Sequence, residues 1–152
     1  MHIYSPAFDI GSTVPFKYTC DGDNISPPLT WEDPPQATQS FALILEDPDA
    51  PQKTFIHWVI YNLPAQIRQL PEAVPNQPSL PEGGLQGKND FGQLGYGGPC
   101  PPNGTHRYFF KLLALDTFLE LEPGITKADL KAAMAGHILD AAEIMGRYAR
   151  QG

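Results

Sequence analysis

Proline and glycine occur along almost the whole chain and restrict its fold more than any other feature. The sequence has 17 prolines and 14 glycines among 152 residues. Proline interrupts helices because it lacks a backbone N–H, and both residues favour tight turns, so long helices are disfavoured over most of the chain. We therefore expect short strands joined by shaped turns over the first two thirds of the sequence.

The length and the hydrophobic content fit one globular domain. A chain of this size buries roughly 70% of the surface that its unfolded form exposes, which is enough for one core. Apolar residues make up 41% of the sequence and charged residues 18%, which excludes a disordered chain and a coiled coil. No repeat or linker divides the sequence, so we expect a single domain over residues 1–152.

The charge balance and the hydropathy pattern narrow the classes of partner. The net charge is −7 and lysine and arginine form no cluster, so binding to a nucleic acid is not expected. No segment approaches the ~20 apolar residues of a membrane-spanning helix, and the first residues do not resemble a signal peptide. We expect a cytoplasmic protein with no transmembrane segment.

Three apolar segments are the clearest strand predictions. They cover residues 41–46, 55–61 and 107–115, which are rich in aromatic and branched side chains. Residues 41–45 are apolar without alternation, which is typical of a strand that is covered on both faces. Shorter extended pieces are expected near residues 16–19 and 29–31.

The second half of the chain predicts a long loop and then helices. Residues 71–104 are rich in Pro, Gly and Asn, and a loop of this length is usually functional. Thr126 and Asp129 have the spacing of a capping box in front of a helix. A second helix is expected over residues 138–150, with its apolar stripe, including Tyr148, packed on the sheet. The predicted fold is mainly β with peripheral C-terminal helices.

Familiar enzyme signatures are missing. Lys88 is followed by Asn89, so a phosphate-binding loop would lack its Ser or Thr. The glycines from Gly95 onward begin like a dinucleotide-binding fingerprint, but Cys100 stands in the third glycine position and prolines follow. The sequence contains neither HExxH nor GxSxG. Nucleotide-triphosphate sites and the common hydrolase sites are therefore not supported.

Polar side chains collect at the ends of the predicted strands. Asp47 follows the first strand, His57 lies in the second, and His106 and Tyr108 open the third. Alternate residues of a strand share a face, so His106 and Tyr108 should point the same way. A structural role is the simpler interpretation for any one of these residues alone. Together they form a set with anion-binding or proton-transfer chemistry.

His57 needs a hydrogen-bond partner. Strand alternation places it on the face of Phe55, Val59 and Tyr61, where an unpartnered imidazole would be costly. We expect Asp47 or Asp49 to be that partner.

Two cysteines, Cys20 and Cys100, lie in turn-like contexts and form no CxxC pair. In a reducing compartment we expect two free thiols, and a disulfide is the alternative.

Three segments carry a family resemblance by their order and spacing: DPDAP (residues 47–51), HWVIYN (57–62) and GPCPPNGTHRY (98–108). On these segments the chain resembles the phosphatidylethanolamine-binding proteins, which include the Raf kinase inhibitor proteins, in their bacterial and archaeal branch. Flanking segments extend the resemblance over nearly the whole chain: YTCDGDNISPPLTW, GKNDFGQLGYGG and HILDAAEIMGRYAR.

The resemblance implies an antiparallel β-sandwich with peripheral helices and a small pocket for an anion. Carried over position by position, the ligand-binding residues would be Asp47, Ala50, Pro51, His57, Gly98, His106 and Tyr108. Asp49 would support the turn, and Tyr148 is the candidate for closing the pocket. The anion would contact both histidines, the tyrosine and the backbone N–H of Gly98, while Asp47 would orient an imidazole.

The function implied is that of a non-catalytic binding module without a cofactor or a bound metal. Its ligand would be a phosphorylated small molecule, a lipid head group or a phosphoprotein, and a kinase or a protease would be the regulated target. A homodimer is compatible with the sequence. The alternative is a metal-assisted or acid–base enzyme that uses the two histidines and the aspartate.

Two geometric expectations follow from the motif. The resemblance places the loops beside Cys20 and Cys100 toward the pocket, so the two cysteines should lie close in space. Cα atoms much more than ~7 Å apart would exclude an unstrained disulfide. The sharp turn at Ala50 and Pro51 should contain a cis or otherwise constrained proline.

Overall fold

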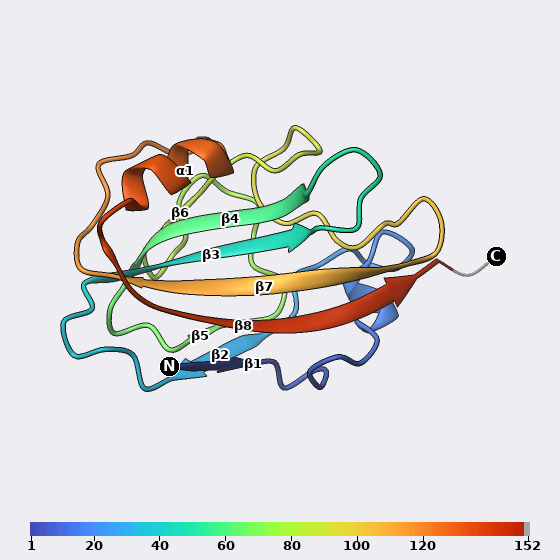
Figure 1. The fold of residues 1–152 in the computed structure, drawn as a ribbon, viewed down its shortest axis with the longest axis horizontal. Helices are drawn as coiled ribbons and strands as arrows, with labels where there is room; N and C mark the ends of the chain where they lie inside the picture. Colours follow the sequence, from blue (N-terminus) through green and yellow to red (C-terminus); the bar gives the residue numbers. More distant parts are fainter. Residues whose placement is uncertain (151–152) are drawn as a thin grey trace.

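Two antiparallel sheets form the protein, as a computed structural model that describes residues 1–150 shows (Figure 1). The larger sheet has the strand order β6 (Leu85–Gln86), β4 (Phe55–Pro64), β3 (Ser40–Asp47), β7 (Thr105–Leu115) and β8 (Ile138–Ala149). The smaller sheet has the order β1 (His2–Tyr4), β2 (Leu29–Glu32) and β5 (Gln69–Leu70). The predicted mainly β sandwich is confirmed.

Strand β3 lies in the middle of the large sheet, and all its residues are buried. Leu43 and Leu45 belong to the core between the two sheets. Ile44 points to the other face, where it packs in a second cluster with Leu130 and Met134 of α1 (Lys127–Met134). Continuous apolarity in residues 41–45 therefore reflects a strand that is covered on both sides, as expected.

Helix α1 begins at the predicted capping box. The Thr126 hydroxyl accepts a hydrogen bond from the Asp129 N–H at 3.3 Å, and the Asp129 carboxylate accepts one from the Thr126 N–H at 3.3 Å. Two backbone donors of the first turn are thus satisfied. Gly136 has a φ of 82°, a left-handed conformation that lets the chain turn from the helix into β8.

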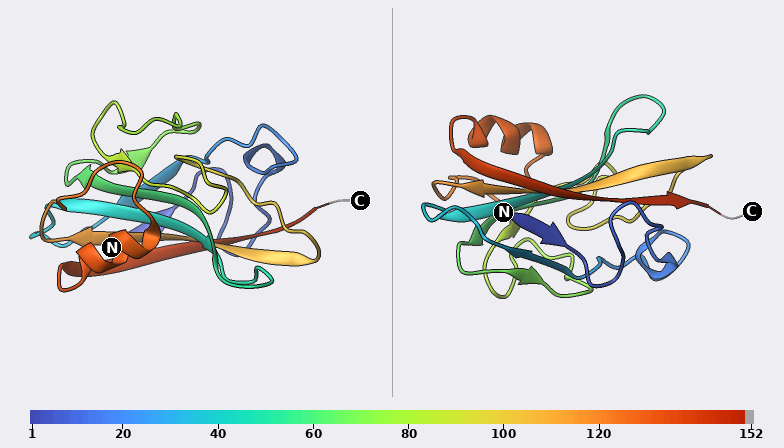
Figure 2. Two further views of the ribbon diagram at one scale, coloured as in Figure 1. Left: turned by 90° about the horizontal axis from the view of Figure 1, so that it is seen from above. Right: turned by 60° about the horizontal axis from the view of Figure 1, so that its bottom comes forward.

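Residues 138–149 form strand β8, so the prediction of a second helix is wrong. The strand pairs with β7 from Thr105↔Ala149 to Leu115↔Ile138, and it runs along the full length of the sheet in both views of Figure 2. Its alanine-rich sequence is compatible with either structure, but the long edge of β7 offers a pairing partner that outweighs local helix propensity. Helix α1 is the one α-helix in residues 1–150.

Of the two short extended segments expected from the sequence, the structure confirms one. Residues 29–32 form β2, as expected, whereas Phe16–Tyr18 form a 3₁₀ turn, η1, rather than an extended piece. The connection over residues 71–104 is irregular except for the short strand β6. No helix within residues 1–150 has the length and apolar character needed to cross a membrane.

Cys20 and Cys100 form a disulfide, with a Cα–Cα distance of 5.4 Å. Their expected proximity is confirmed, and the expectation of two free thiols is wrong. The bond joins the segment after η1 to the segment that leads into β7, where the Cys20 N–H also donates to the Pro99 carbonyl at 3.1 Å. These two segments are 80 residues apart in sequence.

Candidate functional site

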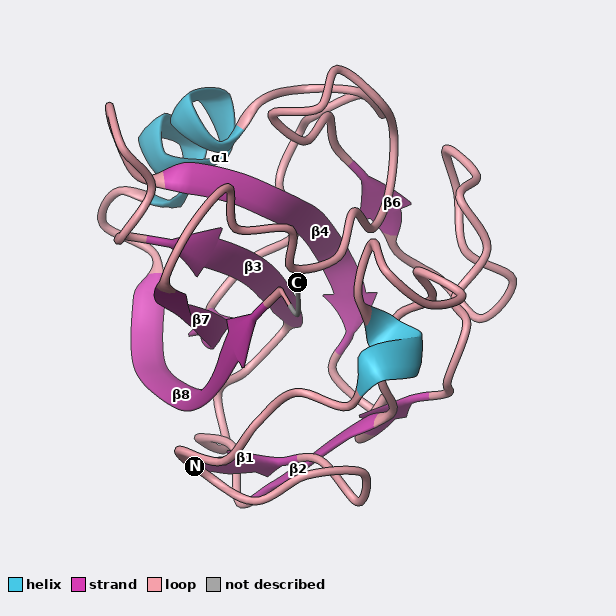
Figure 3. Cartoon of the chain, turned by 90° about the vertical axis from the view of Figure 1, so that its right-hand side faces the viewer, coloured by secondary structure: helices cyan, strands magenta, loops and turns pink. Residues whose placement is uncertain are grey.

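The predicted site residues meet at one end of the large sheet, where the β3–β4 loop and the segment before β7 lie near each other (Figures 1 and 3). A cavity of about 230 Å³ opens there, lined by Asp47, Ala50, Pro51, Phe55, His57, Phe91, Cys100, Pro101, Pro102, His106 and Tyr108. Six of the seven predicted ligand-binding residues therefore line one cavity. Gly98 does not.

A β-bulge places His57 at this cavity. The pairing of β3 with β4 shifts between Leu45↔Trp58 and Glu46↔Ile56, which leaves His57 as the extra residue. Bulges bend a strand and redirect a side chain. As a result, the His57 ring lies 5.3 Å from the Tyr108 ring, on the face toward the small sheet.

The face predicted for His57 is therefore wrong. Two of its three expected neighbours, Val59 and Tyr61, point to the opposite face and pack in the cluster under α1. The third, Phe55, does lie beside it, with the two ring centroids 5.0 Å apart. Simple alternation holds from Trp58 onward but fails at the bulge, and nothing in the sequence marks that position.

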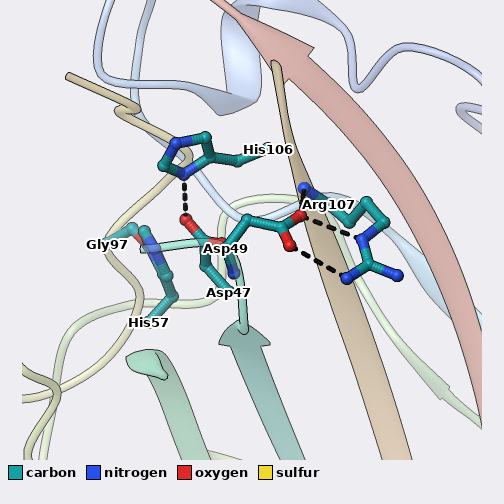
Figure 4. A network of polar contacts seen from close by, with 6 residues as sticks. All are labelled: Asp47, Asp49, His57, Gly97, His106 and Arg107. Carbon is teal, nitrogen blue, oxygen red and sulfur yellow. Dashed lines mark hydrogen bonds and ion pairs between the residues drawn. The ribbon is translucent and has the colours of Figure 1, made fainter. Parts of the chain in front are cut away.

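Asp47 pairs with His106. The carboxylate oxygen Oδ2 lies 2.6 Å from His106 Nδ1, and the exposed fractions of the two side chains are 4% and 8% (Figure 4). A carboxylate at this distance accepts the Nδ1–H proton and fixes the ring orientation. His106 Nε2 has no hydrogen-bond partner among the described residues, so it is available to a ligand.

His57 is held by the backbone and not by Asp47 or Asp49, contrary to expectation. Its Nδ1 lies 2.7 Å from the Gly97 carbonyl oxygen. Because a carbonyl can only accept, Nδ1 carries the proton. Burial lowers the pKa of His57, and the hydrogen bond to Gly97 and the charge of Asp47 offset only part of that effect. The neutral ring therefore has an unprotonated Nε2.

The stability of the domain should fall in acid partly because of His57. An unfolded imidazole titrates near pH ~6.5, and the folded pKa is lower, so the unfolded chain binds more protons in this range. The stabilisation from neutral His57 is complete above about pH 6.5 and is lost as the pH falls toward the folded pKa. We expect urea midpoints to drop less between about pH 7.5 and about pH 5 in His57→Asn than in the natural sequence.

The exposed His2 provides the control for this measurement. His2→Asn should keep the acid sensitivity of the natural sequence, since His2 is exposed on β1 and does not line the cavity that holds His57. Equal acid sensitivity in His57→Asn and the natural sequence would contradict the prediction.

Tyr108 contributes a buried hydroxyl to the cavity. The side chain is fully buried, and its Oη has no hydrogen-bond partner among residues 1–150. Burial raises the pKa of Tyr108 far above its ordinary value, and the negative charge of Asp47 raises it further. The phenol thus stays protonated and can donate a hydrogen bond to a ligand.

Asp49 is hydrogen-bonded both within the turn and to β7. Its carboxylate makes a bidentate pair with the Arg107 guanidinium at 2.9 Å and 2.9 Å, which lowers the pKa of Asp49 to about 2 (Figure 4). The Asp49 N–H donates to Asp47 Oδ1 at 2.7 Å. All peptide bonds in the described residues are trans, so of the two alternatives expected for this proline, the cis bond is wrong.

Two predicted residues have other roles in the structure. The Gly98 N–H donates to the Asn24 side-chain carbonyl at 2.8 Å, so it is not available to a ligand in the cavity. The Tyr148 hydroxyl donates to the Asp21 carboxylate at 2.6 Å, and Tyr148 does not line the cavity. Tyr148 lies on strand β8, where it is paired with His106, and not on a helix that could close the pocket.

Sequence reasoning predicted Ala50 and Pro51 but missed five other apolar positions of the lining: Phe55, Phe91, Cys100, Pro101 and Pro102. The ring of Phe91, which is 45% exposed, lies edge-on to Phe55 and His57 at 4.8 Å and 5.3 Å. Cys100, which is held by its disulfide, and the two prolines after it also line the cavity. Four of these five positions lie within segments 87–98 and 98–108. The family resemblance of those segments was therefore the signal that could have identified them.

The described part of the chain contains no cluster of side chains suited to binding a metal ion. Within residues 1–150, no three side chains of His, Cys, Asp or Glu are grouped so that they could hold a metal ion. The Asp47 carboxylate is instead occupied by His106 and by the Asp49 N–H.

Comparison with known proteins identifies the family. Residues 4–149 match the model of the phosphatidylethanolamine-binding proteins. A UPF0098 protein of Methanothermobacter thermautotrophicus is 53% identical over 150 residues, which cover 99% of each chain. A UPF0098 protein of Aquifex aeolicus is 51% identical over 99% of this chain and 89% of its own length.

Solved structures agree with this assignment. The crystal structure of a phosphatidylethanolamine-binding protein homologue from Chlamydia trachomatis superposes with a TM-score of 0.91 at 42% identity, covering 99% of this chain and 97% of the other. YbcL of E. coli, described as a new member of the mammalian PEBP family, also has a TM-score of 0.91, at 34% identity over 99% and 98% of the two chains. The chain therefore belongs to the phosphatidylethanolamine-binding protein family.

Proposed function

We propose that the protein is a non-catalytic module that binds a phosphate group in the cavity between His57, His106 and Tyr108. The group would belong to a small molecule, a head group or a protein side chain, and its binding would regulate a partner such as a kinase or a protease. Family membership supports a binding module, and the chemistry of the lining supports the anionic ligand.

One observation carries this proposal: the Tyr108 hydroxyl is buried at the cavity without a partner. Buried polar groups almost always have a hydrogen-bond partner, and an unsatisfied donor destabilises the fold. A ligand oxygen in the cavity would complete the missing bond. A phosphate oxygen suits this place because it is a strong acceptor.

His106 adds a second donor beside Tyr108. As an imidazolium, its ring would stay paired with Asp47 at 2.6 Å and would donate from Nε2 toward the cavity. Charge-assisted hydrogen bonds to phosphate are about twice as strong as neutral ones. Asp47 therefore acts by positioning His106, since a carboxylate in direct contact with the anion would repel it.

Two substitutions test the proposal. His106→Ala removes a charge-assisted donor, whose loss is worth about 1.5–3 kcal/mol, so affinity for inorganic phosphate should fall roughly tenfold to a hundredfold. Tyr108→Phe removes only the hydroxyl and should weaken binding about fivefold to tenfold. Isothermal titration calorimetry near pH 6.5 measures both effects, with circular dichroism as the check on folding.

Matched variants are available for each substitution. His137 pairs with Asp116 at 2.8 Å as His106 pairs with Asp47, but it is exposed and far from the cavity lining. His137→Ala and Tyr148→Phe should therefore keep the affinity of the natural sequence. Unchanged affinity in both folded cavity variants would show that phosphate binds elsewhere, and no phosphate binding at all would refute the function.

A further inference from the structure

The acceptor character of His57 Nε2 is fixed by the fold. Nδ1 lies 2.7 Å from the Gly97 carbonyl oxygen, which can only accept, so the neutral ring carries its proton on Nδ1. Nε2 then presents a lone pair. No described residue donates a hydrogen bond to it, and His57 is a lining residue of the cavity.

The surroundings oppose a second proton on this ring. His57 is 3% exposed, and the rings of Phe55, Phe91 and Tyr108 lie 5.0 Å, 5.3 Å and 5.3 Å from it. Such an apolar setting disfavours an imidazolium. His57 is therefore neutral at neutral pH.

The charged groups near His57 are carboxylates and one further histidine. From β3, Asp47 already accepts the proton of His106 Nδ1. From the loop that follows β6, Asp90 accepts the N–H of Ile56 at 2.8 Å. From β7, His106 and the neutral Tyr108 face the same cavity. Among the described residues that line it there is no Lys or Arg, so only an imidazolium at His106 could compensate the charge of a deprotonated ligand oxygen there.

A bare oxyanion and this nitrogen are both acceptors. Two lone pairs that face each other in a buried site form no hydrogen bond and leave both groups unsatisfied. A ligand oxygen that carries a hydrogen removes the conflict, because its O–H donates to Nε2. Hydrogen phosphate and the monoanion of a phosphate monoester have such an oxygen, whereas sulfate and phosphodiesters have none.

Building on the proposed function, we propose that His57 selects tetrahedral oxyanions that bring their own proton, through an O–H···Nε2 hydrogen bond. The ligand class is then free phosphate or a phosphate monoester, on a metabolite or on a protein side chain. A phosphodiester, the linkage of an intact phospholipid head group, falls outside this class.

Four small probes test the selection by calorimetry. At pH ~8 inorganic phosphate is still hydrogen phosphate, so sulfate, of the same shape and charge, should bind roughly tenfold to a hundredfold more weakly. Near pH ~6 about half of methyl phosphate keeps its proton, and dimethyl phosphate should bind more weakly than methyl phosphate by a similar factor. Comparing inorganic phosphate with methyl phosphate separates the free ion from an ester.

The same comparison gives a pH signature. Methyl phosphate loses its remaining proton above pH ~6, whereas inorganic phosphate keeps one through pH ~8. The affinity ratio of inorganic phosphate to methyl phosphate should therefore rise by up to about tenfold per pH unit over this range.

A spectroscopic readout on the natural sequence avoids any folding defect of a variant. Nitrogen-15 NMR of the imidazoles should show His57 protonated at Nδ1 only, both before and after saturation with inorganic phosphate at pH ~8. His57→Asn, whose amide can donate as well as accept, should bring the affinities for phosphate and sulfate to within a few fold. A doubly protonated His57 in the phosphate complex would overturn the inference.

The possible failures differ from those of the proposed function. If phosphate binds and sulfate or dimethyl phosphate binds equally well, the selection by His57 is refuted and the phosphate site stands. If neither inorganic phosphate nor methyl phosphate binds, the function itself is refuted and the selection with it.

Discussion

Replacing Cys20 and Cys100 together with serine should lower the free energy of unfolding by about 2–5 kcal/mol. The disulfide closes a loop between residues 80 apart in sequence. In the chain-entropy model a closed loop of that length corresponds to about 4.5 kcal/mol, because the crosslink restricts the unfolded chain. Denaturation with guanidinium, followed by tryptophan fluorescence, measures the loss.

Reducing agent provides the control for the cysteine variant. The natural sequence in dithiothreitol should lose as much stability as the double serine variant, and the variant should be insensitive to the reagent. A variant as stable as the oxidised natural sequence would show that the bond does not contribute to stability. Because Cys100 lines the cavity, phosphate binding by the variant reports whether the bond also holds that wall.

Strands with strong apolar character could be predicted from the sequence, and the last strand could not. Residues 41–46 and 107–115 are apolar enough that β structure follows from composition and bounding residues. Residues 138–149 contain alanine, glutamate and methionine, which favour helices locally. Their strand conformation depends on eleven residues of β7 that lie earlier in the chain, which is a tertiary effect.

The candidate site could also be predicted from the sequence only in part. The closeness of His106 and Tyr108 follows from strand alternation, and both line the cavity. The position of His57 depends on a bulge, and its partner is the Gly97 carbonyl, a backbone group that no residue type announces. Side-chain identity thus indicated the chemistry of the site but not the pairing within it.

Gly98 was expected to bind the ligand, but in the structure it is packed closely against other backbone segments. This packing leads to a prediction with a large effect on stability. An added Cβ at Gly98 would lie 2.3 Å from the Tyr18 carbonyl oxygen, 2.6 Å from Asn24 Oδ1 and 3.0 Å from Thr19 Cα. Two of these atoms belong to the backbone and cannot rotate away. We expect Gly98→Ala to reduce the free energy of unfolding by about 3 kcal/mol, the upper part of the usual range for overpacking.

Gly104→Ala is the matched control for this substitution. Gly104 has a φ of 69° and nothing within 4 Å of an added Cβ, so alanine there should cost only about 1 kcal/mol of left-handed strain. Alanine at position 98 keeps the backbone N–H that donates to Asn24, so a loss of stability cannot come from a missing hydrogen-bond donor. A Gly98→Ala protein with natural stability would show that the segments around Cys20 and Cys100 separate easily. The expected loss of stability would instead show that position 98 requires glycine because backbone segments pack closely there. That packing brings the two cysteines within bonding distance beside the cavity.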